Sequence, residues 1–124
     1  MLIVITSCNQ QGYDEELLKK QITDMTNDYN KVWETLNVEK IATSNAHLRK
    51  IFPSILSNTK EFSMKTLQPV VQVLNKHAAI ISFIVEAEII ETDGKKLNET
   101  GVLTYVWNNI DGEWKIIHIH ESGK

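Results

Sequence analysis

Residues 105–122 read YVWNNIDGEWKIIHIHES, from Tyr105 to Ser122. Two runs rich in aromatic and β-branched residues flank a polar segment, and this segment contains Asp111-Gly112, a pair that tight hairpin turns favour. We therefore predict a hairpin in which a strand from about Thr100 to Asn108 turns back into a strand from Trp114 to Glu121. Such a hairpin requires an antiparallel sheet around it.

The residues before the hairpin predict two further strands. Apolar residues alternate with polar ones from Phe62 to Leu74, and Pro69 within this run marks a bulge or an edge position. The next run, Ala78 to Thr92, is rich in Ile and Val and ends at Asp93-Gly94, which are turn residues. The four strands are consecutive, so we expect a meander.

The N-terminal half predicts helices. After Asp14, a suitable N-cap, apolar residues recur every three or four positions from Leu18 to Leu36, the spacing of one long amphipathic helix. A second apolar stripe predicts a helix from Asn45 to about Asn58, kinked or divided at Pro53. The predicted fold class is α+β, with N-terminal helices packed on an antiparallel sheet.

Size and composition set the limits of this fold. The 124 residues suit one domain, 42% of them are hydrophobic and 23% are charged, and no apolar run approaches the ~20 residues that span a bilayer. The formal net charge is −3, with Lys and Arg scattered along the chain. The sequence therefore lacks the basic patch of a nucleic-acid-binding protein, and we predict no nucleic-acid partner.

Cys8 is the single cysteine, so the chain cannot form an intrachain disulfide or a cysteine-based zinc site. The run Leu2 to Ser7 before it is similar to the end of a bacterial lipoprotein signal, in which the cysteine after an apolar stretch is lipidated. This run is shorter than the ~7–15 residues expected, and no Lys or Arg precedes it. Two alternatives stay open. Either residues 1–8 are a lipoprotein signal remnant, with Cys8 lipidated and the protein in the cell envelope, or the likeness is accidental and the protein is cytoplasmic.

The order aromatic, Asp-Gly turn, Trp114, then His118-x-His120-x-Ser122 resembles the end of SnoaL-like domains of the nuclear transport factor 2-like superfamily. It is particularly similar to the association domain of calcium/calmodulin-dependent protein kinase II. The resemblance covers residues 9–124 and implies a strongly curved, cone-like sheet with helices on its concave side, a pocket there, and dimers or larger rings. Relatives place a short helix and a strand pair between the first two helices, whereas here only Val38 to Ser44 separates them.

Strand alternation sorts the side chains into two faces. We place Ile117 on the concave face and assign Trp114, Ile116, His118 and His120 to the opposite face. The predicted ligand pocket consists of the concave-face residues Phe83, Val85, Leu103, Tyr105, Trp107, Ile119 and Glu121. The related kinase domain carries arginines at the positions of Val85, Tyr105 and Glu121. Their absence here favours a small apolar ligand over an anionic one.

Two functions follow from these faces. The first is a small-molecule-binding or oligomerisation module, a homodimer or higher homo-oligomer that reaches a membrane only through a lipid anchor. The dimer is predicted to bury Glu88, Val106, Ile116 and His118. The alternative is a small enzyme of the isomerase, cyclase or dehydratase type, with Glu121 as general base and Tyr105 as hydrogen-bond donor. His118 and His120 are a weak metal signal, and we predict no metal and no cofactor.

Overall fold

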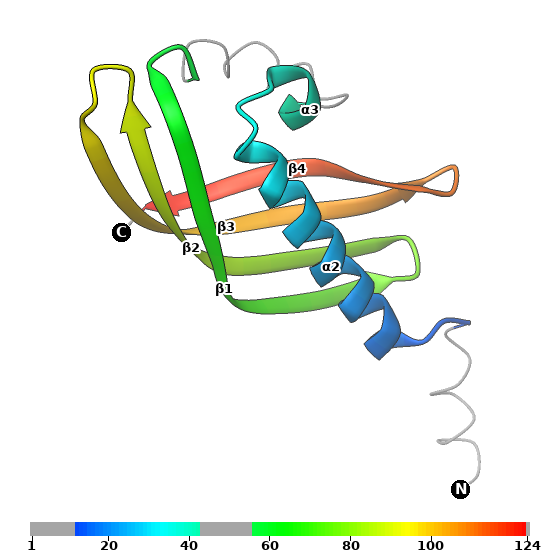
Figure 1. The fold of residues 1–124 in the computed structure, drawn as a ribbon. Helices are drawn as coiled ribbons and strands as arrows, with labels where there is room; N and C mark the ends of the chain where they lie inside the picture. Colours follow the sequence, from blue (N-terminus) through cyan, green and yellow to red (C-terminus); the bar gives the residue numbers. More distant parts are fainter. Residues whose placement is uncertain (1–11, 43–55, 124) are drawn as a thin grey trace, which may run out of the picture.

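The computed structural model describes residues 12–42 and 56–123. Within these ranges, two helices precede a sheet of four antiparallel strands in the order β1-β2-β3-β4, so that each strand pairs with the next one along the chain (Figure 1). The elements are α2 (Glu15–Trp33), α3 (Val38–Ala42), β1 (Thr59–Asn75), β2 (Ala78–Glu91), β3 (Lys96–Ile110) and β4 (Glu113–Gly123). The predicted α+β class and the four-stranded meander are confirmed.

Helix α2 begins where the sequence predicts. Asp14 is the N-cap, and its carboxylate accepts a hydrogen bond of 3.1 Å from the backbone N–H of Leu17. The stripe that faces the sheet buries Leu18 and Ile22 almost completely. The helix ends at Trp33, three residues before the predicted end, and Leu36 then adopts a left-handed φ of 56°. The end of the helix is therefore set by a local change of backbone direction.

The segment after α2 is not a plain connection, because Val38–Ala42 forms the short helix α3. Ile41 of this helix is fully buried, and its carbonyl accepts a 2.5 Å hydrogen bond from the hydroxyl of Tyr29 on α2. The predicted helix from Asn45 to Asn58 lies almost wholly outside the described residues.

Tight turns connect the strands. The β3–β4 hairpin turns through Asp111 and Gly112, which have φ angles of 54° and 84°. Two successive positive φ values define the turn whose twist matches that of the flanking strands, and Asp-Gly is a favoured pair for it. The sequence prediction of this hairpin is confirmed.

Strand β1 contains an irregularity at its middle. The register with β2 shifts between Leu67 and Val70, and within the shift Gln68 has a φ of 51° and Pro69 follows. Proline lacks a backbone N–H, so it is placed in a sheet at edges and bulges. The predicted bulge or edge position at Pro69 is confirmed in both senses, because β1 is also an edge strand.

A bulge on β4 corrects the predicted faces. Val106 pairs with His118, but Trp107 pairs with Ile116, so Ile117 is an extra residue without a partner in the ladder. An extra residue reverses the alternation on one side of a bulge. Trp114 and Ile116 therefore pack on the core, and the side chain of Ile117 is 49% exposed. The predicted placement of these three residues was wrong.

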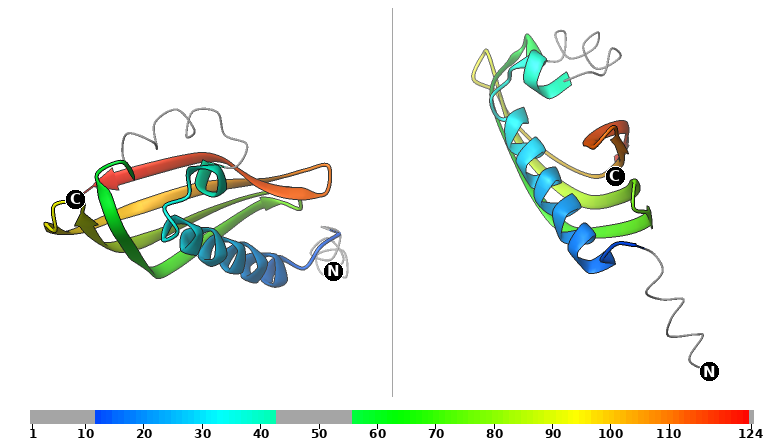
Figure 2. Two further views of the ribbon diagram at one scale, coloured as in Figure 1. Left: turned by 45° about the horizontal axis from the view of Figure 1, so that its top comes forward. Right: turned by 90° about the vertical axis from the view of Figure 1, so that its right-hand side faces the viewer.

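Helix α2 lies across the concave side of the curved sheet, which we call the inner face (Figure 2). Its residues and those of β2 and β3 form the core. The buried members of this core cluster are Leu18, Ile22, Ala79, Ile81, Phe83, Val85, Tyr105 and Trp107. Among the described residues, no helix is both long and apolar enough to cross a membrane.

Candidate functional site

The residues predicted to line a ligand pocket lie together on the inner face. Phe83, Val85, Tyr105 and Trp107 are each at most 7% exposed and belong to the core under α2, while Leu103 and Ile119 are half-buried beside them. Side chains of α2 contact two of them, because Asn30 bonds to Tyr105 and Thr26 bonds to Trp107. The ligand-binding role assigned to this set stays a prediction.

The inner face carries a buried polar network that the sequence did not predict. The Tyr105 hydroxyl donates a 2.6 Å hydrogen bond to Asn30 Oδ1, and Asn30 Nδ2 donates one of 3.0 Å to Thr66 Oγ1 on β1. Nearby, Trp107 Nε1 donates to Thr26 Oγ1 at 3.0 Å. Thr26 and Asn30 are 0% and 3% exposed, so these hydrogen bonds replace the water that the polar groups lose on burial.

Burial sets the protonation of the two tyrosines in this region. Desolvation, and secondarily the neighbouring Tyr29, raises the pKa of Tyr105 far above its ordinary value. Burial also raises the pKa of Tyr29 to about 12. Both hydroxyls therefore stay protonated at neutral pH, and each uses its hydrogen in a bond to another group of the protein.

Glu121, the predicted general base, lies in a different environment from Tyr105. It pairs with Leu103 in the β3–β4 ladder, whereas Tyr105 pairs with Ile119, so the two residues share the inner face at neighbouring positions. Glu121 is exposed and Tyr105 is fully buried. The acid–base role of this pair stays a prediction.

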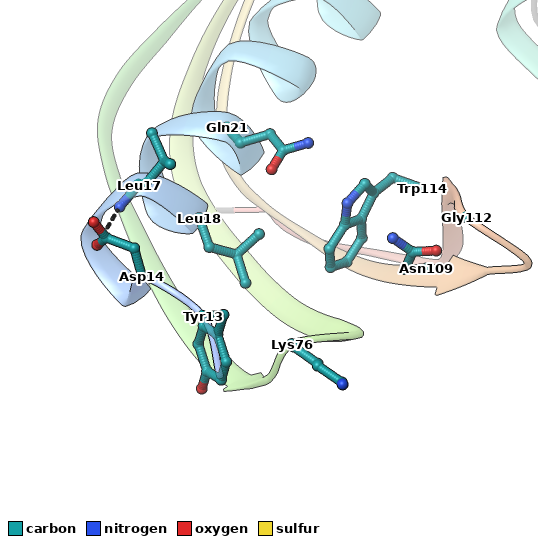
Figure 3. Close-up of a pocket in the computed structure, with 9 residues that line it drawn as sticks. All are labelled: Tyr13, Asp14, Leu17, Leu18, Gln21, Lys76, Asn109, Gly112 and Trp114. Atoms are coloured by element: carbon teal, nitrogen blue, oxygen red, sulfur yellow. Dashed lines mark hydrogen bonds between the residues drawn. The ribbon is translucent and has the colours of Figure 1, made fainter. Parts of the chain in front are cut away.

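A groove of about 380 Å³ opens at the N-terminal end of α2 (Figure 3). Three parts of the chain form it: the start of α2, the β1–β2 turn and the β3–β4 hairpin. The lining residues are Tyr13, Asp14, Leu17, Leu18, Gln21, Lys76, Asn109, Gly112 and Trp114. Figure 3 shows Leu18 and the Trp114 indole on opposite sides of the groove, and Gln21 extends from α2 toward the indole.

The polar groups of the groove include two side-chain amides. Gln21 and Asn109 lie on different walls, and within residues 12–42 and 56–123 neither side-chain amide makes a hydrogen bond to another group. Asp14 and Lys76 are the charged lining residues, one of each sign. The groove therefore combines one aromatic wall with two side-chain amides that have no hydrogen-bond partner among the described residues.

The opposite side of the sheet, which we call the outer face, carries an apolar patch. Strand pairing aligns Leu67, Ile84 and Val102 in one row across β1, β2 and β3. In the adjoining rows Val70 aligns with Ser82 and Thr104, and Ile80 with Val106. The side chains of Leu67, Val70 and Val102 are 36%, 68% and 41% exposed. No described helix covers this face (Figure 2).

His118 and His120 belong to the outer face, where they pair with Val106 and Thr104. Both are exposed. Among the residues with described positions, no group of three or more His, Cys, Asp or Glu side chains is placed to hold a metal ion. Cys8, the candidate for lipidation, lies outside the described part of the chain.

Solved structures define the class of this fold. A nuclear transport factor 2-like superfamily protein from Salmonella enterica serovar Typhimurium has a TM-score of 0.74 at 18% identity, covering 89% of this chain and 93% of that chain. A candidate scytalone dehydratase from Novosphingobium aromaticivorans has a TM-score of 0.78 at 16% identity, covering 88% and 86%. The fold is thus the nuclear transport factor 2-like α+β cone fold, as the resemblance implied.

The particular family follows from the sequence. The family model of the calcium/calmodulin-dependent protein kinase II association domain matches residues 9–124, and the chain belongs to this family. The association domain of that kinase from C. elegans has a similar structure, with a TM-score of 0.66 at 16% identity, covering 87% of this chain and 97% of that chain.

Proposed function

We propose that this chain is a self-association module, in which the outer faces of two copies pack against each other. The observation that carries the proposal is the apolar patch on the outer face, where Val70 and Val102 are 68% and 41% exposed. A sheet with apolar residues on both faces is stable in water when both are covered, and α2 covers only the inner one. Membership of a family of association domains supports a second copy as the cover.

The layout of the outer face suits a twofold contact. Ile84 and Val102 lie on the two central strands, while the polar side chains of Lys65 and Glu86 pair beside the patch and those of His118 and His120 border it. An apolar centre with a polar rim is the usual anatomy of a protein interface. Two identical patches related by a twofold axis can pack together, since each residue meets its own symmetry mate or that of a neighbour.

The replacement Val102→Lys tests this proposal. It places a charge at the centre of the patch, where burial against a second copy would leave that charge without a partner. We expect the wild-type protein to form an oligomer of the 14.2 kDa chain, and the variant to have a dissociation constant raised by about 100-fold or more. Light scattering coupled to size exclusion, over a range of protein concentrations, measures both masses.

Leu17→Lys is the matched control, because Leu17 is a 63% exposed leucine on α2, away from the outer face. This variant should keep the wild-type mass. A wild-type protein that is monomeric at about 100 μM would refute the proposal. So would an oligomer that Val102→Lys leaves intact.

We further propose that Cys8 carries a lipid anchor, on the basis of the apolar run from Leu2 that precedes it. Expressed with its N-terminal sequence in a bacterial host, the wild-type protein should appear in the membrane fraction and Cys8→Ser in the soluble fraction. Ser7→Ala, which keeps the cysteine, is the control and should fractionate like the wild type. Equal fractionation of the wild type and Cys8→Ser would refute the anchor.

A further inference from the structure

The groove at the start of α2 is an open hollow with an aromatic side chain in its lining. One wall is the half-buried Trp114 indole, and Leu18, which is 8% exposed, lies across from it (Figure 3). An indole gains stabilisation when a planar π-system stacks on it, and this gain is largely independent of the identity of the ring. A volume of about 380 Å³ is at the small end of ligand sites, which suits one ring or two fused rings.

The polar groups of the groove favour a neutral ligand. Asp14 and Lys76 contribute one charge of each sign, and the Asp14 carboxylate already accepts a hydrogen bond from the Leu17 N–H. The other polar groups of the lining side chains are the amides of Gln21 and Asn109, the hydroxyl of Tyr13 and the indole N–H of Trp114. A side-chain amide presents a donor next to an acceptor, so it pairs with a ligand edge that presents an acceptor next to a donor. Carboxamides and nitrogen heterocycles have such edges.

We propose that this groove binds a small, neutral, planar heteroaromatic molecule that has a carboxamide-type edge. The ring stacks on Trp114, and its polar groups bond to the amides of Gln21 and Asn109 on the two walls of the groove. The site lies on the α2 side of the sheet, away from the outer face. Its occupation therefore does not depend on the proposed self-association.

Nicotinamide is the probe, because it is neutral, planar and heteroaromatic and has a carboxamide. In a ¹⁵N–¹H correlation spectrum the indole N–H of each tryptophan gives its own signal, and the Trp114 signal is assigned as the one that Trp114→Phe removes. We expect the Trp114 signal to shift in a saturable way with a midpoint of about 1–10 mM, and the buried Trp107 signal to stay in place. Val102→Lys should show the same titration.

Gln21→Ala and Asn109→Ala should each raise the midpoint about 3- to 10-fold, the effect of losing one hydrogen bond. The matched controls are Gln72→Ala on β1 and Asn98→Ala on β3, which remove the same amides outside the groove and should not change the midpoint. A Trp114 signal without saturable shift up to about 20 mM would overturn the proposal. Benzoate binding more tightly than nicotinamide, with its affinity lost in Lys76→Gln, would overturn the neutral ligand class.

Discussion

Phe83→Ala is expected to lower the free energy of unfolding by about 3–5 kcal/mol, the largest effect of any single change considered for this protein. The Phe83 side chain is 2% exposed on the inner face, and its ring meets that of Tyr105 edge to face with centroids 5.1 Å apart. The substitution removes the buried apolar surface, leaves a cavity under α2 and abolishes the aromatic contact. Denaturant unfolding, followed by far-ultraviolet circular dichroism at one protein concentration, measures the change.

Two further variants keep this prediction testable if Phe83→Ala fails to fold. Phe83→Leu retains most of the apolar volume and should cost about 1–1.5 kcal/mol. Leu17→Ala truncates a side chain that is 63% exposed and should change stability by less than about 0.5 kcal/mol. A Phe83→Leu variant no less stable than the wild type would contradict the tight packing of the inner face.

Asn30→Ala should lower the free energy of unfolding by about 2–3 kcal/mol, because it removes the partner of a hydroxyl that has no access to water. The Tyr105 hydroxyl donates a hydrogen bond to Asn30 Oδ1, and Tyr105 is 0% exposed. The same substitution removes the donor that serves Thr66 Oγ1 on β1. Denaturant unfolding again gives the measurement. Asn27→Ala, at an exposed asparagine on the same helix, is the control and should cost little.

A double-mutant cycle separates this hydrogen bond from general packing. Tyr105→Phe alone should cost about 1–2 kcal/mol, since it leaves Asn30 Oδ1 buried without its donor. In the Asn30→Ala background the hydroxyl has already lost its partner, so its removal should cost nothing or be slightly stabilising. The expected coupling is about 1–2 kcal/mol. If the effects of the two substitutions on the free energy of unfolding are additive, the hydrogen bond does not contribute to stability.

Local patterns predicted the elements of the fold well, because each depends on residues close in the sequence. The N-cap at Asp14, the Asp111-Gly112 turn and the break at Pro69 are examples. The faces of β4 were predicted less well. A bulge at Ile117 arises from how β4 pairs with β3, and strict alternation along a single strand cannot reveal it. The short helix α3 was likewise absent from the sequence prediction.

The polar core and the groove depend on residues that are far apart in the sequence. Tyr105 and Asn30 are separated by 75 positions, and an aromatic residue in a strand gives no indication of its hydrogen-bond partner. One signal was present: Leu18, Ile22, Thr26 and Asn30 are spaced by four and lie on one side of α2. Polar residues that continue an apolar stripe indicate buried partners. The groove gave no local signal, because three separate parts of the chain form it.

The irregularity at Gln68 and Pro69 limits how this sheet can grow. Along β1, an edge strand, the shift between Leu67 and Val70 interrupts the row of backbone donors and acceptors, and Pro69 contributes no N–H. An incoming strand could not stay in register along that margin. A fibre grows by strand pairing only if further chains can add to both edge strands of the sheet. One edge strand that cannot pair therefore opposes fibre growth. Contact through a face, in contrast, ends once two copies have met. The bulge thus favours finite, closed assemblies over filaments.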